Sequence, residues 1–403
     1  MSIERFLFDI ATKRHSENDL ESYDRTSIIN LIKNHRLIDP FLDRYPDFKM
    51  PNNNEENSIM INEGKLKEIN KVISTLNRLQ VDYVVLKGLA MRKYYPSHIS
   101  RQSVDFDFLL KNIESFFEIY PMLKEEGYKL DYFPTFSLEK GEARGVIAVY
   151  KELKSDNPVY IEFNVGGFLI SECTWLTDEG MWSRRRLFEY HSMKYYIPSD
   201  EWNLIILIAE AGGNKFNRLR DAVDYYFLTN NSTIDTGFVN SKIKEWKLHF
   251  QYKRLKKMFN QILRSSYSDP KIKFIHLIKY SFMMEIRHVI PLTLKRYGGK
   301  SFLKLYIHYI RLLGEYYYQR DKCLKFVKKL DWIIPVDLRF KNGIHVHFVP
   351  ILENTSDNWK FYKENNNYFV ISPVGSFLLS NYCLFEEDEL EEEKEKLIVK
   401  VGD

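Results

Sequence analysis

Two aspartates separated by one residue, Asp105 and Asp107, have the type and spacing of a metal-binding pair. They alternate with apolar residues in Val104-Asp105-Phe106-Asp107-Phe108, and residues two apart in a β-strand face the same side. We therefore expect both carboxylates to point one way while the apolar side chains point into a core. Neighbouring carboxylates repel each other unless a cation lies between them. Mg²⁺, which binds through one or two carboxylates plus substrate phosphates, fits this pattern.

A single acidic residue on another predicted strand, Glu162, is the best candidate for a third metal ligand. It lies among apolar neighbours in residues 159–165, with Asn157-Pro158 before them and Gly166-Gly167 after them. A lone carboxylate on a central strand is costly without a partner. Glu162 would supply the third acid that a two-metal site needs.

Residues 81–110 contain the elements that would position the two aspartates. The stretch begins with an apolar strand over residues 83–86, followed by a turn over 87–90 and a short helix over 91–95. A loop then leads into the strand of the aspartates. Upstream, apolar residues at a spacing of three and four predict an amphipathic helix over residues 61–79 that leads into the first strand.

The same stretch resembles a known family at several positions. Leu86-Lys87-Gly88, Tyr95-Pro96, Arg101 and Asp105-Phe106-Asp107 follow the signature of a bacterial nucleotidyltransferase family within the polymerase-beta-like minimal nucleotidyltransferases. In that signature the arginine stands four residues before the Asp-x-Asp motif, and a later strand carries a single acid, here Glu162. Weaker agreement extends toward residue 230.

The resemblance implies a metal-dependent enzyme that moves a nucleoside monophosphate from a nucleoside triphosphate to an acceptor and releases pyrophosphate. Asp105, Asp107 and Glu162 would be the catalytic residues and would hold two Mg²⁺ ions. ATP is the default donor, because no pattern in the sequence indicates recognition of a particular nucleotide base. The acceptor would be a hydroxyl or another group on a small molecule, a peptide or a protein.

Nucleotide-binding residues also follow from the resemblance. Lys87, Arg101 or both would neutralise phosphate charge. In the alternative role, Arg101 would brace the Asp-x-Asp loop. Gly88 would let the backbone approach the β- and γ-phosphates. Lys215 and Arg220 would add phosphate ligands from a later helical segment.

That later segment, residues 216–228, has a second interpretation. Arg220 and Asp224 are four residues apart, so they would form an ion pair along one helix face. Arg218 would serve as a phosphate ligand in place of Arg220, and Asp221 or Asp224 would orient a base or a lysine. The residues leave these alternatives open.

Two positions depart from the family pattern. Asn164 stands where the family often has a histidine two residues after its third acid, and Phe106 is bulkier than the usual residue between the aspartates. Neither change removes a metal ligand, but both bear on the substrate pocket. A catalytically inactive nucleotide-binding or scaffold protein, and a nucleotidyltransferase toxin that modifies tRNA, are the alternatives to a small-molecule or peptide enzyme.

The length of 403 residues predicts more than one domain in an α+β chain. We expect an N-terminal helical segment over residues 1–58 and a polymerase-beta-like core over 59–198, with a mixed sheet and flanking helices. A helical domain over 199–330 and a small β-rich region with an acidic tail over 331–403 would follow.

Composition favours a cytoplasmic protein that does not associate with membranes. The chain is 44% hydrophobic and 28% charged, without a run of eighteen apolar residues and without the pattern of a signal peptide. Cys173, Cys323 and Cys383 lack metal-binding spacing and fit a reducing compartment.

Charge is distributed unevenly along the chain. Residues 241–330 contain 22 Lys or Arg and 5 Asp or Glu, whereas 386–395 contain eight acids among ten residues. The basic region attracts RNA or polyphosphate in one interpretation and forms solvated helix faces in another, and the second is favoured. RNA is therefore the less favoured partner.

Overall fold

The computed structural model describes the residues of fifteen ranges: 2–12, 20–50, 63–101, 103, 105–131, 134–139, 141–153, 158–171, 174–176, 178–213, 218–265, 336–343, 346–352, 360–364 and 367–380. Lys215, the three cysteines, the acidic run 386–395 and much of the basic region lie outside these ranges. The predictions made for them are therefore not addressed by the structure.

The described residues form a mixed α/β structure that divides into two compact units. Unit 1 consists of Met1–Leu109, Tyr150–Glu162 and Leu176–Lys271, and unit 2 of Leu110–Val149, Phe163–Trp175 and Ile272–Asp403. Each unit is built from segments that are separated in the sequence. All the predicted site residues that the structure describes belong to unit 1.

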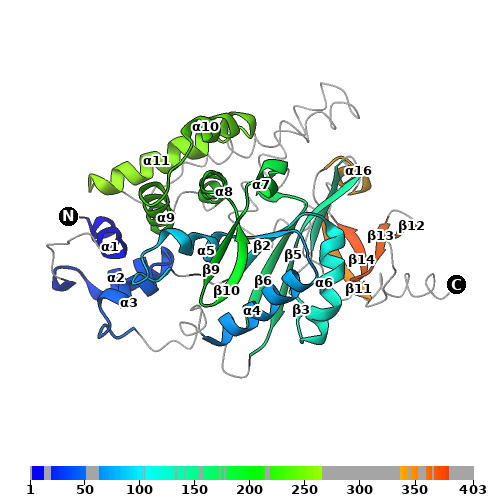
Figure 1. The fold of residues 1–403 in the computed structure, drawn as a ribbon, viewed down its shortest axis with the longest axis horizontal. Coiled ribbons are helices and arrows are strands. Elements are labelled where there is room, and N and C mark those ends of the chain that lie inside the picture. Colours follow the sequence, from blue (N-terminus) through cyan, green and yellow to red (C-terminus); the bar gives the residue numbers. More distant parts are fainter. Residues whose placement is uncertain are drawn as a thin grey trace. The chain divides into compact units, whose positions relative to one another are not determined.

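Unit 1 is mainly helical. Its described helices are α1 (Ile3–Ala11), η1 (Leu20–Ser22), α2 (Arg25–Asn34), α3 (Ile38–Arg44), α4 (Glu63–Arg78), α5 (Lys87–Met91), η2 (Arg92–Tyr94), α7 (Glu179–Ser183), α8 (Asp200–Gly213), α9 (Leu219–Asn230), α10 (Thr236–Glu245) and α11 (His249–Leu263). Figure 1 shows α8, α9, α10 and α11 gathered in one group.

The strands of unit 1 form one run and one hairpin. The run has the order β1 (Tyr83–Leu86), β2 (Phe106–Leu110) and β6 (Val159–Val165), and β6 counts with unit 1 up to Glu162. The hairpin joins β9 (Arg186–Tyr190) to β10 (Met193–Ile197) in antiparallel pairing. Its two turn residues, His191 and Ser192, both have positive φ, as a type I′ turn requires.

Local sequence explains the main helices of unit 1. The buried face of α4 contains Ile69, Val72, Ile73 and Leu76, which recur at helical spacing. In α8, every residue from Asp200 to Ala209 is buried, because the helix is apolar almost all round. At the start of α2, the side chain of Asp24 accepts a hydrogen bond from the Ser27 backbone N–H and caps the helix.

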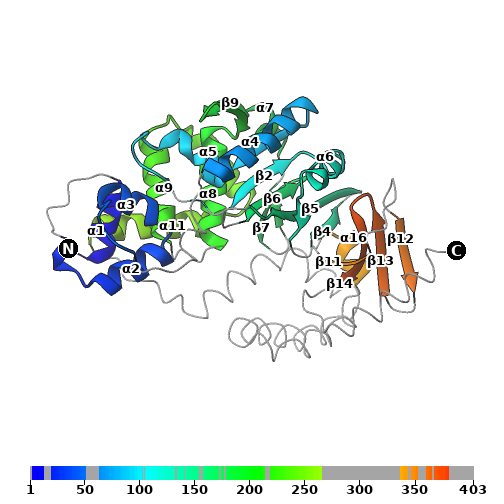
Figure 2. The same cartoon turned by 90° about the horizontal axis from the view of Figure 1, so that it is seen from below.

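Unit 2 is mainly β-structure. Its described elements are α6 (Ile113–Glu125), β3 (Lys129–Leu130), β4 (Thr135–Glu139), β5 (Glu142–Lys151), β7 (Phe168–Ser171), β8 (Thr174–Leu176), α16 (Val336–Lys341), β11 (Val346–Leu352), β12 (Lys360–Glu364), β13 (Asn367–Ser372) and β14 (Gly375–Ser380). The main run has the order β5-β4-β11-β14-β13-β12, β3 pairs with β5, and β7 pairs with β8. Figure 2 shows β12 and β13 side by side.

Several predicted elements are confirmed. The strand over 83–86 is β1, and the amphipathic helix is α4. At the start of α6, Asn112 accepts a hydrogen bond from Ser115 N–H and caps the helix. Pro121 lies inside α6, which is nevertheless one continuous helix from Ile113 to Glu125.

Other predicted elements are wrong. The segment after Lys87 is not a turn, because α5 begins at Lys87 itself. Within the region expected to be β-rich, residues 336–341 form the helix α16, whereas Gly375–Ser380 form the strand β14. In β14 all six residues are buried, and pairing with both β11 and β13 outweighs local propensity.

Candidate active site

The predicted acidic residues come from two neighbouring strands. Asp107 lies in β2 and is 2% exposed, and Asp105 is half-buried in the residue position just before that strand. Glu162 lies in β6, the next strand in the run β1-β2-β6. Phe106 and Phe108 are buried, as expected for the apolar residues that alternate with the aspartates. The structure therefore brings the Asp-x-Asp motif and the third acid to adjacent strands.

Lys87 supplies a positive charge among these acids. Its Nζ lies 2.7 Å from Asp107 Oδ1 and donates a hydrogen bond to it. Glu162 Oε1 is 3.6 Å from the same Nζ. The backbone of Lys87 has φ +47°, in a region that non-glycine residues seldom adopt. Such strained positions cluster at functional sites, and here the strain places the lysine where β1 passes into α5.

A third carboxylate, Glu210 in α8, also lies near this lysine. Its Oε2 is 3.6 Å from Lys87 Nζ, and its side chain is 25% exposed. Glu210 is not among the site residues predicted from the sequence. The signal that would have found it is the one that found Glu162, because Glu210 is the single acid after the apolar run Leu204–Ala209.

The electrostatics of this cluster show an excess of negative charge. Burial raises the pKa of Asp107 well above its usual value, and the neighbouring carboxylates Asp105 and Glu162 raise it further, against the effect of Lys87. Burial opposes the charge of Lys87, but Asp107, Glu210 and Glu162 outweigh it and raise the pKa of the lysine. Asp107 and Lys87 therefore both hold their protons more tightly than usual, because the one ammonium does not neutralise the negative charge of the surrounding carboxylates.

This donor set fits a divalent cation. It consists of carboxylate oxygens, which are the ligands that Mg²⁺ prefers, and it carries more negative charge than the lysine balances. Among the described residues, no group of three or more His, Cys, Asp or Glu side chains is arranged to hold a metal ion. In this conformation, the lysine lies between the carboxylates instead.

The packing of the protein's own side chains requires a glycine at position 88. A Cβ at this position would lie 2.4 Å from Ser103 Oγ and 3.0 Å from Ser103 Cβ. Ser103 in turn accepts a hydrogen bond of 2.9 Å from Arg101. The absence of a side chain at Gly88 therefore lets the segment before β2 pack against α5, and its approach to phosphate stays a prediction.

Arg101 is buried and bound to Asp224 in α9. It donates from Nε to Oδ1 at 2.8 Å and from NH2 to Oδ2 at 2.7 Å, and Tyr95 donates to Oδ1 at 2.5 Å. Burial works against the charge of Asp224, but Arg101 outweighs it and lowers the pKa of that carboxyl. These contacts tie the segment before β2 to α9, and Arg101 also lines a pocket in unit 1, so both of its predicted roles stay predictions.

Arg220 lies in α9 with 6% of its surface exposed, beside Asp221 at 4.0 Å. The carboxylate of Asp224, its expected partner, makes its hydrogen bonds with Arg101 and Tyr95 instead. Arg220 lines a pocket in unit 1. Other residues that line this pocket include Lys87, Arg101, Asn203, Glu210 and Asp221.

A further arginine from the N-terminal segment lies close to this pocket. Burial lowers the pKa of Arg36, as do the nearby guanidinium groups of Arg220 and Arg218, while Asp105 and Glu210 act in the opposite direction. The residue before it, His35, accepts a hydrogen bond of 3.3 Å from the Leu219 backbone N–H at the start of α9. The three arginines place positive charge beside the acids, and the sequence contains no pattern that reveals Arg36.

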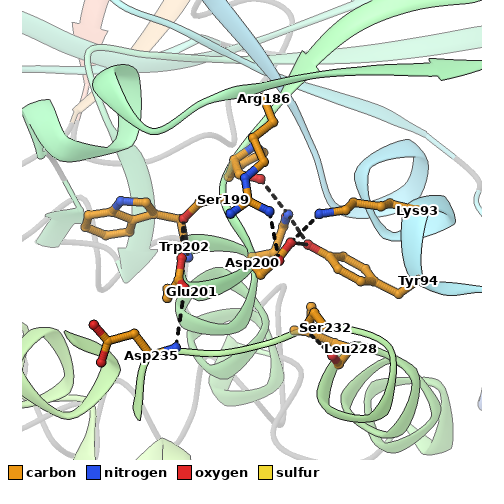
Figure 3. A network of polar contacts seen from close by, with 12 residues as sticks. Lys93, Tyr94, Arg186, Ser199, Asp200, Glu201, Trp202, Leu228, Ser232 and Asp235 are labelled. Atoms are coloured by element: carbon orange, nitrogen blue, oxygen red, sulfur yellow. Dashed lines mark hydrogen bonds and ion pairs between the residues drawn. The ribbon is translucent and has the colours of Figure 1, made fainter. Parts of the chain in front are cut away.

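A polar network holds α8 in place relative to the segment after β1. Asp200, in the first turn of α8, accepts hydrogen bonds from Lys93 at 2.5 Å, Tyr94 at 2.8 Å and Arg186 at 2.9 Å. Figure 3 shows Lys93 and Tyr94 on one side of Asp200 and Arg186 on another. Asn203, which also lines the pocket, donates to Tyr94 Oη at 3.0 Å. The network therefore fixes the helix that carries Glu210.

Comparison with known proteins places this site in a family. Residues 35–263, more than half of the chain, match the model of a family described as "Uncharacterised nucleotidyltransferase". The chain belongs to this nucleotidyltransferase family. The matched range contains both strands of acids, α8 and α9.

The chain is similar to the crystal structure of an antigenic nucleotidyltransferase-like protein from Paracoccidioides brasiliensis, with 13% identity and a TM-score of 0.30 over 49% of this chain and 94% of that chain. No curated protein matches the sequence. In the part of the chain that the structure describes, no helix is long and apolar enough to cross a membrane.

Proposed function

We propose that the protein is a metal-dependent nucleotidyltransferase that moves a nucleoside monophosphate from a nucleoside triphosphate to an acceptor. ATP is the proposed donor, and AMP the transferred group. The acceptor is a hydroxyl or another nucleophilic group on a small molecule, a peptide or a protein. The proposed core is polymerase-beta-like, with β1, β2 and β6 as the strands that carry the site.

One observation carries this proposal. In a chain that belongs to a nucleotidyltransferase family, two adjacent strands bring three acids together, and the ammonium of Lys87 lies between two of them. Lys87 Nζ contacts Asp107 at 2.7 Å and Glu162 at 3.6 Å. Asp105 precedes β2 and adds to the negative charge around Asp107. A buried acidic cluster that attracts a cation is the feature that metal-dependent transfer of a phosphoryl-containing group requires.

Asp105, Asp107 and Glu162 would hold two Mg²⁺ ions. When bound, the metal would polarise the phosphate oxygens and favour the deprotonated form of the acceptor. Lys87 contacts two strand acids, and Glu162 is the more exposed of them: its side chain is 24% exposed, against 2% for Asp107. It is therefore the acid best placed to accept the proton of the acceptor.

Positively charged side chains would bind the triphosphate. Arg36 and Arg220 lie beside the acids, and Lys87 would contact phosphate once its ammonium has left Asp107. Lys215 is a further proposed phosphate ligand. Arg101 would act indirectly, because its bonds to Asp224 fix the segment that leads into β2.

The proposed reaction makes one bond and breaks one. The acceptor oxygen attacks the α-phosphorus and loses its proton, and the bond from the α-phosphorus to the bridging oxygen of the β-phosphate breaks. Pyrophosphate leaves with that oxygen. The products are the nucleotidylated acceptor and pyrophosphate, and no oxidant or reductant is needed.

Labelled ATP tests the proposal. The purified protein is incubated with Mg²⁺, lysate fractions and ATP labelled at either the α- or the γ-phosphate. Transfer of the α label to an acceptor, with release of labelled pyrophosphate from γ-labelled ATP, is the expected result. Transfer of the γ label to the acceptor would show a phosphotransferase, and tight ATP binding without transfer would show an inactive nucleotide-binding protein.

A further inference from the structure

Three carboxylates from three elements surround one ammonium group. Lys87 Nζ lies 2.7 Å from Asp107 Oδ1 in β2, and 3.6 Å from both Glu162 Oε1 in β6 and Glu210 Oε2 in α8. The proposed function uses Asp107 and Glu162 as metal ligands. It gives no role to Glu210, which is not among the predicted site residues.

Lys87 and a divalent ion compete for the same carboxylate. The ammonium donates a hydrogen bond to Asp107 Oδ1 and lies 3.6 Å from Glu162 Oε1, and these two side chains are among those that would hold the metal ion. Two positive charges so close together repel strongly in a buried site, where the effective dielectric constant is low. The lysine must therefore move away from Asp107 when a metal ion binds.

Glu210 offers the lysine another partner without a large movement. Its carboxylate is already within ion-pair distance of Nζ, and both side chains line the same pocket. The Asp200 network and the buried apolar residues hold α8, the helix that carries Glu210, in place. Lysine carries its ammonium on a flexible four-carbon stem, so Nζ can shift from Asp107 toward Glu210.

We propose that Glu210 is a positioning residue that receives the ammonium of Lys87 when a divalent metal ion binds to Asp107 and Glu162. In the metal-free protein, Lys87 takes the place of the metal ion and reduces repulsion between the carboxylates. In the metal-bound protein, Glu210 neutralises the displaced lysine. Glu210 thereby increases metal affinity without contacting the metal. This inference rests on the proposed function, which makes the strand acids metal ligands.

A double-mutant cycle on metal affinity tests this role. The full-length protein is titrated with Mn²⁺ alone, and free Mn²⁺ is measured by electron paramagnetic resonance. We expect Glu210→Gln to weaken Mn²⁺ binding by about tenfold, because the displaced lysine loses its partner. Lys87→Met is expected to tighten binding by about tenfold, because it removes the competing cation.

The double variant separates positioning from direct ligation. If Glu210 acts through Lys87, then Glu210→Gln in the Lys87→Met background should weaken binding by no more than about two- to threefold. A loss of about tenfold in both backgrounds would show that Glu210 is a metal ligand or acts on the metal directly, and would overturn the inference. Lys87→Gln replaces Lys87→Met if circular dichroism shows that the latter is unfolded.

Two controls make the outcomes distinct. Glu189→Gln removes the same charge from an exposed side chain in β9 and is expected to leave Mn²⁺ affinity unchanged. Asp107→Asn is expected to abolish tight Mn²⁺ binding. If Asp107→Asn weakens binding and Glu210→Gln has no effect, the role of Glu210 is wrong and the metal site of the proposed function stands. If Asp107→Asn binds Mn²⁺ as the wild type does, the metal site itself is wrong.

Discussion

Arg101 donates hydrogen bonds to both carboxylate oxygens of Asp224, although 123 residues separate them in the sequence. The pair joins the segment before β2 to α9, and the side chains of both residues are almost completely buried. Two parallel N–H···O bonds fix orientation as well as distance. The position of Asp105 and Asp107 therefore depends on a contact made far along the chain.

The first prediction concerns this buried pair. Arg101→Met should lower the free energy of unfolding by about 3–5 kcal/mol, because it leaves a buried carboxylate without its guanidinium partner. Urea denaturation of the variant and the wild type measures the difference. Arg185→Met, which breaks the more exposed pair with Asp82, serves as the control and should cost less than about 1 kcal/mol. Equal losses in the two variants would contradict the structural role given to Arg101.

The second prediction concerns the close packing of Gly88. Gly88→Ala should lower the free energy of unfolding by about 1–3 kcal/mol, because the new Cβ would lie 2.4 Å from Ser103 Oγ. Combining it with Ser103→Ala removes the closer contact, so the double variant should lose less than the sum of the two single changes. Thermal or urea unfolding of the four proteins gives the coupling. Strict additivity would show that the two residues do not meet.

The third prediction concerns pH. Burial, followed by the nearby carboxylate of Asp43, raises the pKa of Asp39 from 3.8 to about 6, with Arg92 acting in the opposite direction. A carboxyl whose pKa is raised by folding stabilises the protein while it is protonated, and this contribution is lost as the pH rises from about 4 to about 6.

Asp39→Asn removes that titration. The free energy of unfolding of the variant relative to the wild type should therefore increase by up to about 3 kcal/mol between pH 3.5 and pH 7. Urea denaturation at a series of pH values measures this difference, and Asp47→Asn at an exposed position is the matched control. A difference that does not change with pH would show that Asp39 titrates normally.

Much of the sheet that carries the site could be predicted from local sequence. The apolar run before Lys87, the alternation around Asp105 and Asp107, and the isolated Glu162 are visible within short windows, and β1, β2 and β6 occur where these patterns lie. The hairpin β9–β10 was missed because its turn uses His191 and Ser192 instead of the Asn-Gly or Asp-Gly pair that signals a type I′ turn in a sequence.

The contacts that complete the site could not be predicted in this way. Glu210 meets Lys87, and Asp224 meets Arg101, only because α8 and α9 pack beside the segment after β1. Their sequence neighbours indicate helices but not partners. The expected pair within α9 was Arg220 with Asp224, yet a buried carboxylate is better satisfied by the two-pronged contact from Arg101.

The fourth prediction concerns Asp107. It tests the central claim, which is that Asp105, Asp107 and Glu162 support nucleotidyl transfer. Asp107→Asn should reduce transfer of the α label from ATP by at least about a hundredfold, because it removes a charge from the proposed metal site. It should leave the protein folded, because the cluster already has excess negative charge. Asp131→Asn, an exposed change of the same kind, should retain full activity.

The rate of α-label transfer by the wild type, Asp107→Asn and Asp131→Asn, each shown to be folded by circular dichroism, is the most direct measurement. We expect transfer by the wild type and by Asp131→Asn, and its loss in Asp107→Asn. Undiminished transfer by folded Asp107→Asn would contradict the role of Asp107 in nucleotidyl transfer.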